Sequence, residues 1–266
     1  MTANQTSRRN FIKTLTASSL TTLIIPDSFT SFENDINSQT AGGKNGMVFL
    51  FQGDSITDGN RGRRYTDLNH IMGHGFAFSI ASRLGCDFPE KNLKFINRGV
   101  SGNKVTDLAD RWKEDALDLN PDVLTILVGI NDTNSVIDNK PNVTPVTLQK
   151  FDEVYRSILD QAIKQNPEIT FVLCQPFIFK YASTLNNWEL RYNDMIQRQK
   201  VVEKISSDYK AIYLKLQDVF DEAAKKAPAG YWIWDGVHPT VAGHELITRE
   251  WIRQVRKKIK FIKSVC

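Results

Sequence analysis

The chain is 266 residues long, with 41% hydrophobic and 24% charged residues, a composition typical of a soluble globular protein with one sizeable core. Its formal net charge of +4 is too small to indicate nucleic-acid binding. The three cysteines, Cys86, Cys174 and Cys266, lie far apart and have no neighbouring histidine cluster. We therefore expect neither a disulfide framework nor a structural metal site.

Residues 1–44 have the pattern of an export signal followed by a linker. Residues 7–13 have the sequence SRRNFIK, which resembles a twin-arginine leader, and a short apolar run follows. That run is too short for a membrane span of roughly 20 apolar residues. We expect the twin-arginine machinery to export the protein to the bacterial periplasm or beyond, with a catalytic domain over residues 45–266. A disordered basic tail and a retained anchor are the alternatives.

From about residue 45, short apolar runs alternate with longer amphipathic ones. The short runs are β-branched or aromatic and bounded by turn residues, which predicts buried strands over residues 47–52, 93–97, 122–128, 169–175 and 211–214. The amphipathic stretches predict helices over residues 70–84, 104–119, 147–166, 187–207 and 240–262. This alternation predicts a single three-layer α/β domain, in which helices cover both faces of a parallel five-stranded sheet.

Four polar clusters follow predicted strands or precede the last helix. They are GDSITDG at 53–59, NRGVSGN at 97–103, GIND at 129–132 and WDGVHP at 234–239. Parallel α/β sheets bind their ligands at the carboxyl ends of the strands. We therefore expect the four clusters to converge at one edge of the sheet.

Ser55, His238 and Asp235 have the chemistry of a charge-relay system. A serine hydroxyl becomes a useful nucleophile only beside a base that a third group orients. Ser55 lies at a glycine-containing strand-to-helix turn, and Asp235 precedes His238 by three residues, so its carboxylate can turn back to the imidazole. Pro239 biases His238 away from helical geometry and can open the final helix.

Acyl transfer also needs hydrogen-bond donors for the developing oxyanion. Three candidates are the backbone N–H of Ser55 at a helix start, the backbone N–H of Gly102 in an open loop, and the side-chain amide of Asn131.

Ser55, Gly102, Asn131 and His238 fall in the order that names the SGNH (GDSL-type) hydrolases. They lie within the blocks G-D-S, S-G, G-x-N-D and D-x-x-H-P, and the resemblance covers residues 47–250. It implies a flavodoxin-like α/β/α fold, ester hydrolysis, and a Ser-His-Asp triad that works without metal or cofactor. It also implies that Gly102, the glycine of the S-G pair, is the oxyanion-hole glycine.

Longer runs are similar to bacterial carbohydrate esterases that remove acetyl groups from xylan and xylo-oligosaccharides. They are GDSITD at 53–58, NRGVSGNKVTDL at 97–108 with Arg111-Trp112, VGIND at 128–132 and WDGVHPTVAGH at 234–244. Two stretches depart from that group. Residues 133–135 (TNS) replace a frequent aromatic, and the insert at residues 60–74 is unusually basic. We expect both stretches to border the substrate.

Other side chains compete for the catalytic roles. Ser101 is the rival nucleophile, but it lacks a G-x-S-x-G elbow and is expected to shape the oxyanion-hole loop. His244 is expected to be a packed or capping residue of the last helix. His70 and His74 lie in the insert, where contact with substrate is an open alternative.

Structural roles are expected for the remaining polar and aromatic candidates. Asp54 and Asp132 should brace loops through hydrogen bonds. Trp112 and Trp234 should be packing residues, although Trp234 has the alternative of walling a small acyl pocket. The last helix should turn a solvated basic face outward, formed by Arg253, Arg256, Lys257, Lys258, Lys260 and Lys263.

Three functions are compatible with these residues. The first is an O-acetyl esterase acting on a polysaccharide such as xylan, or on its oligosaccharides. The second is a lysophospholipase- or thioesterase-type lipid esterase, which would need a long apolar acyl channel that the polar insert does not suggest. The third is a non-catalytic carbohydrate-binding protein, against which an intact triad argues. We expect no nucleic-acid partner and no membrane insertion of the mature domain, and an oligomer is possible.

Overall fold

The structure is a computed structural model that describes residues 46–64, 66–138 and 140–264. The predicted leader and Cys266 lie outside the described residues. The five strands are β1 (Val48–Gly53), β2 (Lys94–Asn97), β3 (Val123–Leu127), β4 (Thr170–Cys174) and β5 (Ile212–Leu214). They form one sheet in the order β2-β1-β3-β4-β5, and every neighbouring pair is parallel. This order is the flavodoxin-like one, so the predicted sheet is confirmed.

The α-helices of the described residues surround this sheet. They are α2 (Ser55–Asp58), α3 (Phe76–Asp87), α4 (Val105–Asp110), α5 (Trp112–Asp115), α6 (Ile130–Ile137), α7 (Leu148–Gln165), α8 (Trp188–Asp208), α9 (Leu216–Ala224), α10 (Ala229–Trp232) and α11 (Val241–Val255). The predicted helices at 147–166 and 187–207 match α7 and α8 within one residue at each end.

Three helix predictions were too long. α3 begins at Phe76 because the turn before it folds back onto α2, with the His74 N–H donating to the Gly59 carbonyl. The predicted helix at 104–119 is α4, α5 and a short 3-10 turn, and it breaks at Arg111, whose side chain donates to the Arg98 carbonyl. α11 ends at Val255, although the apolar pattern continues into later buried residues.

Helices α6, α9 and α10 were missed. They have eight, nine and four residues, which is too short for a helical period to stand out from the neighbouring loops.

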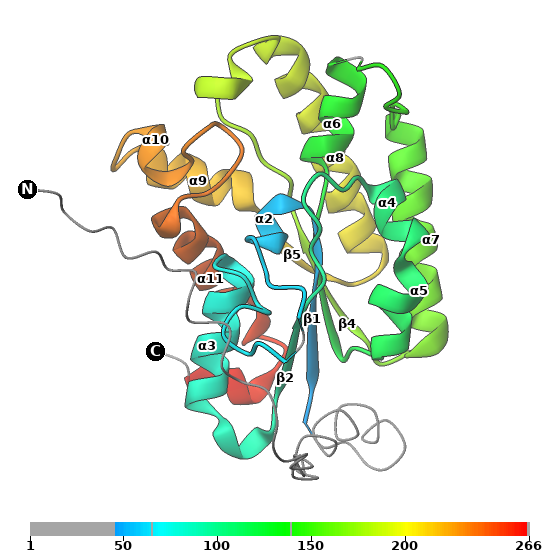
Figure 1. The fold of residues 1–266 in the computed structure, drawn as a ribbon, viewed down its shortest axis with the longest axis vertical. Helices are drawn as coiled ribbons and strands as arrows, with labels where there is room; N and C mark the ends of the chain where they lie inside the picture. Colours follow the sequence, from blue (N-terminus) through cyan, green and yellow to red (C-terminus); the bar gives the residue numbers. More distant parts are fainter. Residues whose placement is uncertain (1–45, 65, 139, 265–266) are drawn as a thin grey trace, which may run out of the picture. The chain divides into compact units, whose positions relative to one another are not determined.

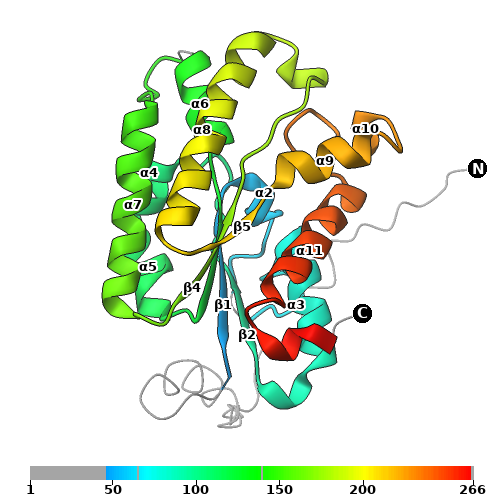
Figure 2. The same cartoon turned by 180° about the vertical axis from the view of Figure 1, so that it is seen from behind.

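Two hydrophobic clusters cover the two faces of the sheet. Successive residues of a strand point to opposite faces, so Phe49 and Phe51 of β1 pack in one cluster and Leu50 packs in the other. The first cluster includes residues of α3, α9 and α11, and the second includes residues of α4, α5 and α7. Figure 1 shows α3 and α11 on one side of the sheet and α4, α5 and α7 on the other, and Figure 2 shows the same layers from behind. The three-layer prediction is therefore confirmed.

No helix within the described ranges is both long enough and apolar enough to cross a membrane.

Helix α11 is attached to the sheet through a buried aromatic residue. Trp251 is fully buried, contacts the rings of Phe49 and Phe51, and donates from Nε1 to the Thr125 Oγ1 of β3 at 2.9 Å. Because both polar atoms are buried, the bond satisfies an indole N–H that has no access to water.

The substitution Thr125→Val is therefore expected to destabilise the protein by about 1–3 kcal/mol, because it leaves that N–H without an acceptor at nearly unchanged volume. In a Trp251→Phe background the same substitution should cost clearly less, since no donor remains. Urea denaturation of the four proteins of this cycle measures both costs. Equal costs in the two backgrounds would contradict the assigned role of the bond.

Candidate active site

Ser55 begins the short helix α2 immediately after β1. Asp54 caps this helix, and its Oδ1 accepts from the Ile56 N–H at 3.0 Å. Gly53 has φ +155°, and a Cβ there would lie 2.2 Å from the Leu127 carbonyl oxygen of β3. Only glycine permits this close approach. The turn therefore presents Ser55 at the carboxyl edge of the sheet.

The structure brings Ser55, His238 and Asp235 into one hydrogen-bonded chain. Ser55 Oγ lies 2.8 Å from His238 Nε2, and His238 Nδ1 lies 2.7 Å from Asp235 Oδ2. Asp235 Oδ1 also accepts from the backbone N–H groups of Val237 at 2.9 Å and His238 at 2.7 Å. Gly236 makes the tight turn between them with φ +94°. The arrangement is the one expected of nucleophile, base and orienting carboxylate.

The Asp235 carboxyl is held in its charged form. Burial acts to raise its pKa, but the hydrogen bonds from the His238 backbone N–H, the His238 ring and the Val237 N–H lower it below the usual value overall. An ionised Asp235 fixes the proton of His238 on Nδ1. The Nε2 atom is then a free acceptor facing the Ser55 hydroxyl.

Gly102 lies in the loop after β2, which we call the hole loop (residues 97–103). The Asn103 N–H donates to the Val100 carbonyl at 3.1 Å, and Gly102 has φ +85° at the third position of this turn, where glycine is favoured. A Cβ on Gly102 would meet nothing within 4 Å. The Gly102 N–H makes no hydrogen bond within the described part of the chain. It is therefore available to a substrate oxygen.

The hole loop is tied to the end of β1 and to helix α6. The Val100 N–H donates to the Gly53 carbonyl at 3.0 Å, which places the loop beside the Ser55 turn. Asn131, in the first turn of α6, donates from Nδ2 to the Asn103 carbonyl at 3.1 Å. The structure thus collects Ser55, Gly102 and Asn131 at one edge of the sheet, as the sequence predicted.

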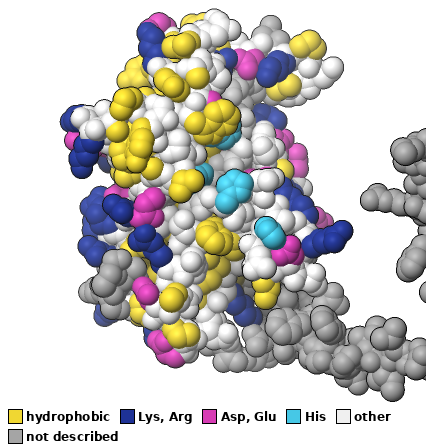
Figure 3. Space-filling view, turned by 60° about the vertical axis from the view of Figure 1, so that its left-hand side comes forward, with side chains coloured by type: hydrophobic (Ala, Val, Ile, Leu, Met, Phe, Trp, Pro, Cys, Tyr) yellow, Lys and Arg dark blue, Asp and Glu magenta, His cyan; other side chains and the backbone are white. Residues whose placement is uncertain are grey.

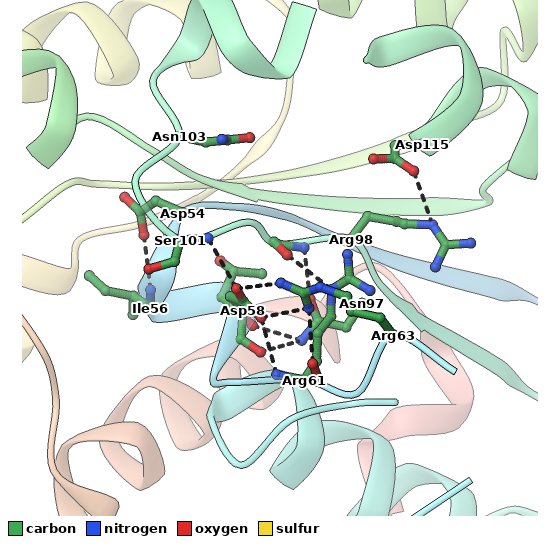
Figure 4. Close-up of polar contacts among 12 residues, drawn as sticks. Asp54, Ile56, Asp58, Arg61, Arg63, Asn97, Arg98, Ser101, Asn103 and Asp115 are labelled. Carbon is green, nitrogen blue, oxygen red and sulfur yellow. Dashed lines mark hydrogen bonds and ion pairs between the residues drawn. The ribbon is translucent and has the colours of Figure 1, made fainter. Parts of the chain in front are cut away.

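Asp58, Arg61 and Arg63 were not predicted to support the site. Figure 4 shows the Asp58 side chain between Ser101 of the hole loop and the two arginines. The prediction that the whole insert borders the substrate is wrong for Arg61, which is 8% exposed and donates from Nε to the Gly99 carbonyl at 2.9 Å. The pattern that could have indicated this ion pair is Asp58, the last residue of GDSITD, shortly before the arginines of the basic insert.

The prediction that residues 133–135 border the substrate is also wrong. Thr133 and Ser135 are buried, and Thr133 Oγ1 donates to Asp194 Oδ2 of α8 at 2.6 Å. The Asn134 Oδ1 accepts from Arg191 of the same helix. Thr133 and Asn134 thus join α6 to α8, and Ser135 Oγ accepts from the Val146 N–H at 2.9 Å.

The other histidines lie where the sequence indicated. His244 is half-buried, caps α3 by accepting from the Phe76 N–H at 3.1 Å, and stacks on the Phe76 ring. Burial, with the nearby His74 and His238, lowers the pKa of His244 to about 4, so it is neutral and its Nδ1 is already occupied. The prediction of a packed or capping residue is confirmed. His70 pairs with Asp67 on the surface, and His74 is exposed.

The two tryptophans differ. Trp112 is buried, as predicted. Trp234 is not a buried packing residue, because 61% of it is exposed, and its ring stacks on the His238 imidazole with centroids 5.9 Å apart. Figure 3 shows a face on which histidine side chains lie among exposed hydrophobic ones.

The predicted solvated basic residues at 253, 256, 257, 258 and 260 are exposed, and the Lys263 side chain lies outside the described residues.

Asp54 and Asp132 brace the site, as predicted. Asp132 Oδ1 accepts from the Val105 N–H at 3.0 Å, which joins α6 to the start of α4. Burial raises the pKa of Asp54 to about 7 and that of Asp132 to about 6, against the opposing effect of their backbone hydrogen bonds.

Within the described ranges, no group of three or more His, Cys, Asp or Glu residues is arranged to hold a metal ion.

Comparison with known proteins gives consistent matches. The model of the GDSL-like lipase/acylhydrolase family matches residues 51–246. The chain is 30% identical to the acetylxylan esterase of Geobacillus stearothermophilus over 213 residues, which cover 79% of this chain and 94% of that one. A solved variant of an acetyl xylan esterase from that organism superposes with TM-score 0.69, covering 79% of this chain and 95% of that one at 30% identity.

Further solved structures match as well. A GDSL-like protein from Parabacteroides merdae has TM-score 0.74 and 33% identity, and the match covers 82% of this chain and 99% of that one. Catalytic mutants of the Geobacillus esterase, in which alanine replaces a serine, an aspartate or a histidine, also match this chain.

The raised pKa of Asp54 predicts a pH-dependent stability difference for Asp54→Asn. Between about pH 4 and 7 the folded protein holds a proton on Asp54 that the unfolded chain releases, so this residue's contribution to stability falls as pH rises. Asparagine keeps an acceptor for the Ile56 N–H and does not titrate. The variant should therefore gain stability relative to wild type as pH rises from 4 to 7, as measured by urea denaturation at several pH values. A difference that does not change with pH would contradict the burial effect.

Proposed function

The chain belongs to the GDSL-like lipase/acylhydrolase family, and we propose that it is a serine esterase that removes O-acetyl groups from a polysaccharide or oligosaccharide such as xylan. It is a carboxylic ester hydrolase. The observation that carries the proposal is the hydrogen-bonded chain from Ser55 Oγ through His238 to Asp235.

Each residue of this chain has a distinct role in the proposed reaction. Ser55 Oγ attacks the ester carbonyl carbon while its proton passes to His238 Nε2. His238 then gives that proton to the departing sugar hydroxyl, which leaves the acetyl group bonded to Ser55. A water molecule activated by His238 attacks the acetyl carbon, and the proton returns to Ser55 Oγ as acetate leaves. Asp235 stays ionised throughout and stabilises the imidazolium.

The oxyanion that forms on the carbonyl oxygen is stabilised by the N–H groups of Ser55 and Gly102 and by the Asn131 amide. The unoccupied Gly102 N–H and the open space beside it support this role. Asn131 has two amide hydrogens, so the bond to the Asn103 carbonyl leaves one of them for the substrate.

The acetylated glycan is proposed from two independent observations. The match covers 94% of the acetylxylan esterase relative. Its catalytic mutants replace a serine, an aspartate and a histidine, which are the residue types of Ser55, Asp235 and His238. In addition, the exposed Trp234 stacks on the ring of His238. Sugar rings commonly stack on such faces, because aromatic side chains offer an apolar body with a polar rim.

We also propose that the protein acts after export by the twin-arginine machinery. The support is the sequence SRRNFIK at residues 7–13, and a catalytic domain beginning near residue 45 is part of the same proposal.

The decisive measurement is acetate release from acetylated xylan, run beside p-nitrophenyl acetate and a long-chain p-nitrophenyl ester. The substitution Ser55→Ala should lower kcat more than about 10⁴-fold, because it removes the nucleophile. The matched substitution Ser101→Ala removes the rival hydroxyl and keeps its backbone N–H, and it should cost less than about tenfold, far below the loss of a triad member.

Three other outcomes would count against parts of this proposal. Unchanged turnover in Ser55→Ala would overturn the mechanism. A preference for the long-chain ester would favour a lipid esterase. Binding to acetylated xylan without acetate release would favour a carbohydrate-binding protein.

The substitution Asp235→Asn tests the orienting role separately. An asparagine amide placed toward Nδ1 donates a hydrogen bond and thereby favours the tautomer whose Nε2 carries the proton. A loss of about 10⁴-fold in kcat is expected, with little change in KM for p-nitrophenyl acetate. Steady-state kinetics measures this, and a loss confined to KM would show that Asp235 acts on substrate binding.

A further inference from the structure

Asp58 ends the helix that Ser55 begins, and its carboxylate points at the hole loop. The side chain is 5% exposed. Its Oδ2 accepts from the Ser101 N–H at 3.0 Å, and its Oδ1 accepts from the Arg61 N–H at 3.1 Å. Ser101 directly precedes Gly102, so this carboxylate holds the donor next to the proposed oxyanion donor.

Arg63, a residue of the insert, forms an ion pair with the Asp58 carboxylate. Its two terminal nitrogens donate to the two carboxylate oxygens at 2.9 and 2.8 Å, which is the bidentate geometry that gives an ion pair directional strength. Burial acts to raise the pKa of Asp58, but the bonds from Arg63, Ser101 and Arg61 lower it overall. The carboxylate is therefore charged, and a charged acceptor binds the Ser101 N–H more strongly than a neutral one.

Further contacts show that this is a region of close backbone approach. Asn97 donates from Nδ2 to the Thr57 carbonyl at 2.7 Å and accepts from the Gly99 N–H at 2.9 Å. A Cβ on Gly99 would lie 2.3 Å from the Asp58 backbone nitrogen. The nucleophile helix and the hole loop are thus in direct contact, and Asp58 joins them at the end nearest to Gly102.

We propose that Asp58 and Arg63 are positioning residues, whose ion pair sets the Gly102 N–H relative to Ser55 Oγ so that both act on the same carbonyl group. This inference rests on the proposed function. Arg63 acts through Asp58 and the backbone of Ser101 and does not touch the substrate. Placement matters because an error of about 1 Å in a reacting group can cost about 10²-fold in rate.

The test begins with Arg63, because its side chain is 51% exposed and its removal leaves no buried hole. Arg63→Ala should lower kcat for p-nitrophenyl acetate about tenfold, short of the about 10²–10³-fold cost of losing an oxyanion donor outright, with KM nearly unchanged. Arg63→Lys keeps the charge but not the bidentate fork, and it should recover part of the loss. Arg64→Ala is the matched control, an exposed neighbour with the same change of charge.

A second measurement separates positioning from stability. Phenylboronic acid adds to a catalytic serine and forms a tetrahedral anion that needs the oxyanion hole. Its affinity should fall in Arg63→Ala by about the same factor as kcat. The pH dependence of kcat/KM should keep its midpoint, because the Asp235–His238 pair is untouched. Asp58→Asn should show the same pattern, and thermal unfolding checks that each variant is folded.

Several results would overturn the inference. One is a lower melting temperature with kcat and boronate affinity within about twofold of wild type, which would make the ion pair purely structural. A raised KM at unchanged kcat would place Arg63 on the substrate. An equal loss in Arg64→Ala would reduce the effect to net charge. Failure of the proposed function is distinct, because it would be seen in wild type as no acetate release from acetylated xylan, whereas this inference compares variants with wild type on p-nitrophenyl acetate.

Discussion

The parallel pairing of β1 with β2 on one side and β3 on the other is the constraint on which the site depends. Gly53 and Leu127, the last residues of β1 and β3, lie opposite each other, and β2 ends at Asn97, opposite Phe51. The chain returns on opposite sides of β1, and such a switch point opens a crevice between the following loops. Ser55 therefore lies between the loop that carries Gly102 and the helix that carries Asn131.

Hydrogen-bond donors divide the carboxylates around the site into two kinds. Asp235 and Asp58 accept several hydrogen bonds, which outweigh the effect of burial and lower their pKa values, so each binds its neighbours as an anion. Asp54 and Asp132 are deeply buried with fewer donors, and their pKa values rise. Aspartate thus serves in two ways at this site: as a charged hydrogen-bond acceptor in Asp235 and Asp58, and as a buried bracing group in Asp54 and Asp132. The number of donors relative to the depth of burial decides between the two roles.

The basic insert shows that a run of charged residues does not reveal its role until the hydrogen-bond partners of its side chains are known. A run of arginines beside a nucleophile suggested contact with substrate. In the structure, Arg61 is buried against the Gly99 carbonyl, and Arg63 pairs with Asp58. The same holds for Thr133 and Asn134, whose polar groups bond to α8. The partners of Arg61 and Thr133 lie 38 and 61 residues away in sequence.

The sequence by itself determined the five strands, the two long helices α7 and α8, and the convergence of Ser55, Gly102, Asn131, Asp235 and His238. These depend on local periodicity, on turn residues, and on the rule that parallel strands end at one edge. Tertiary structure alone decided the breaks and ends of α3, α4 and α11, the exposure of Trp234, and the partners of Asp58 and Thr133. The physical reason is that these features depend on contacts between segments tens of residues apart, such as Asp58 with Ser101, and no local pattern in the chain records them.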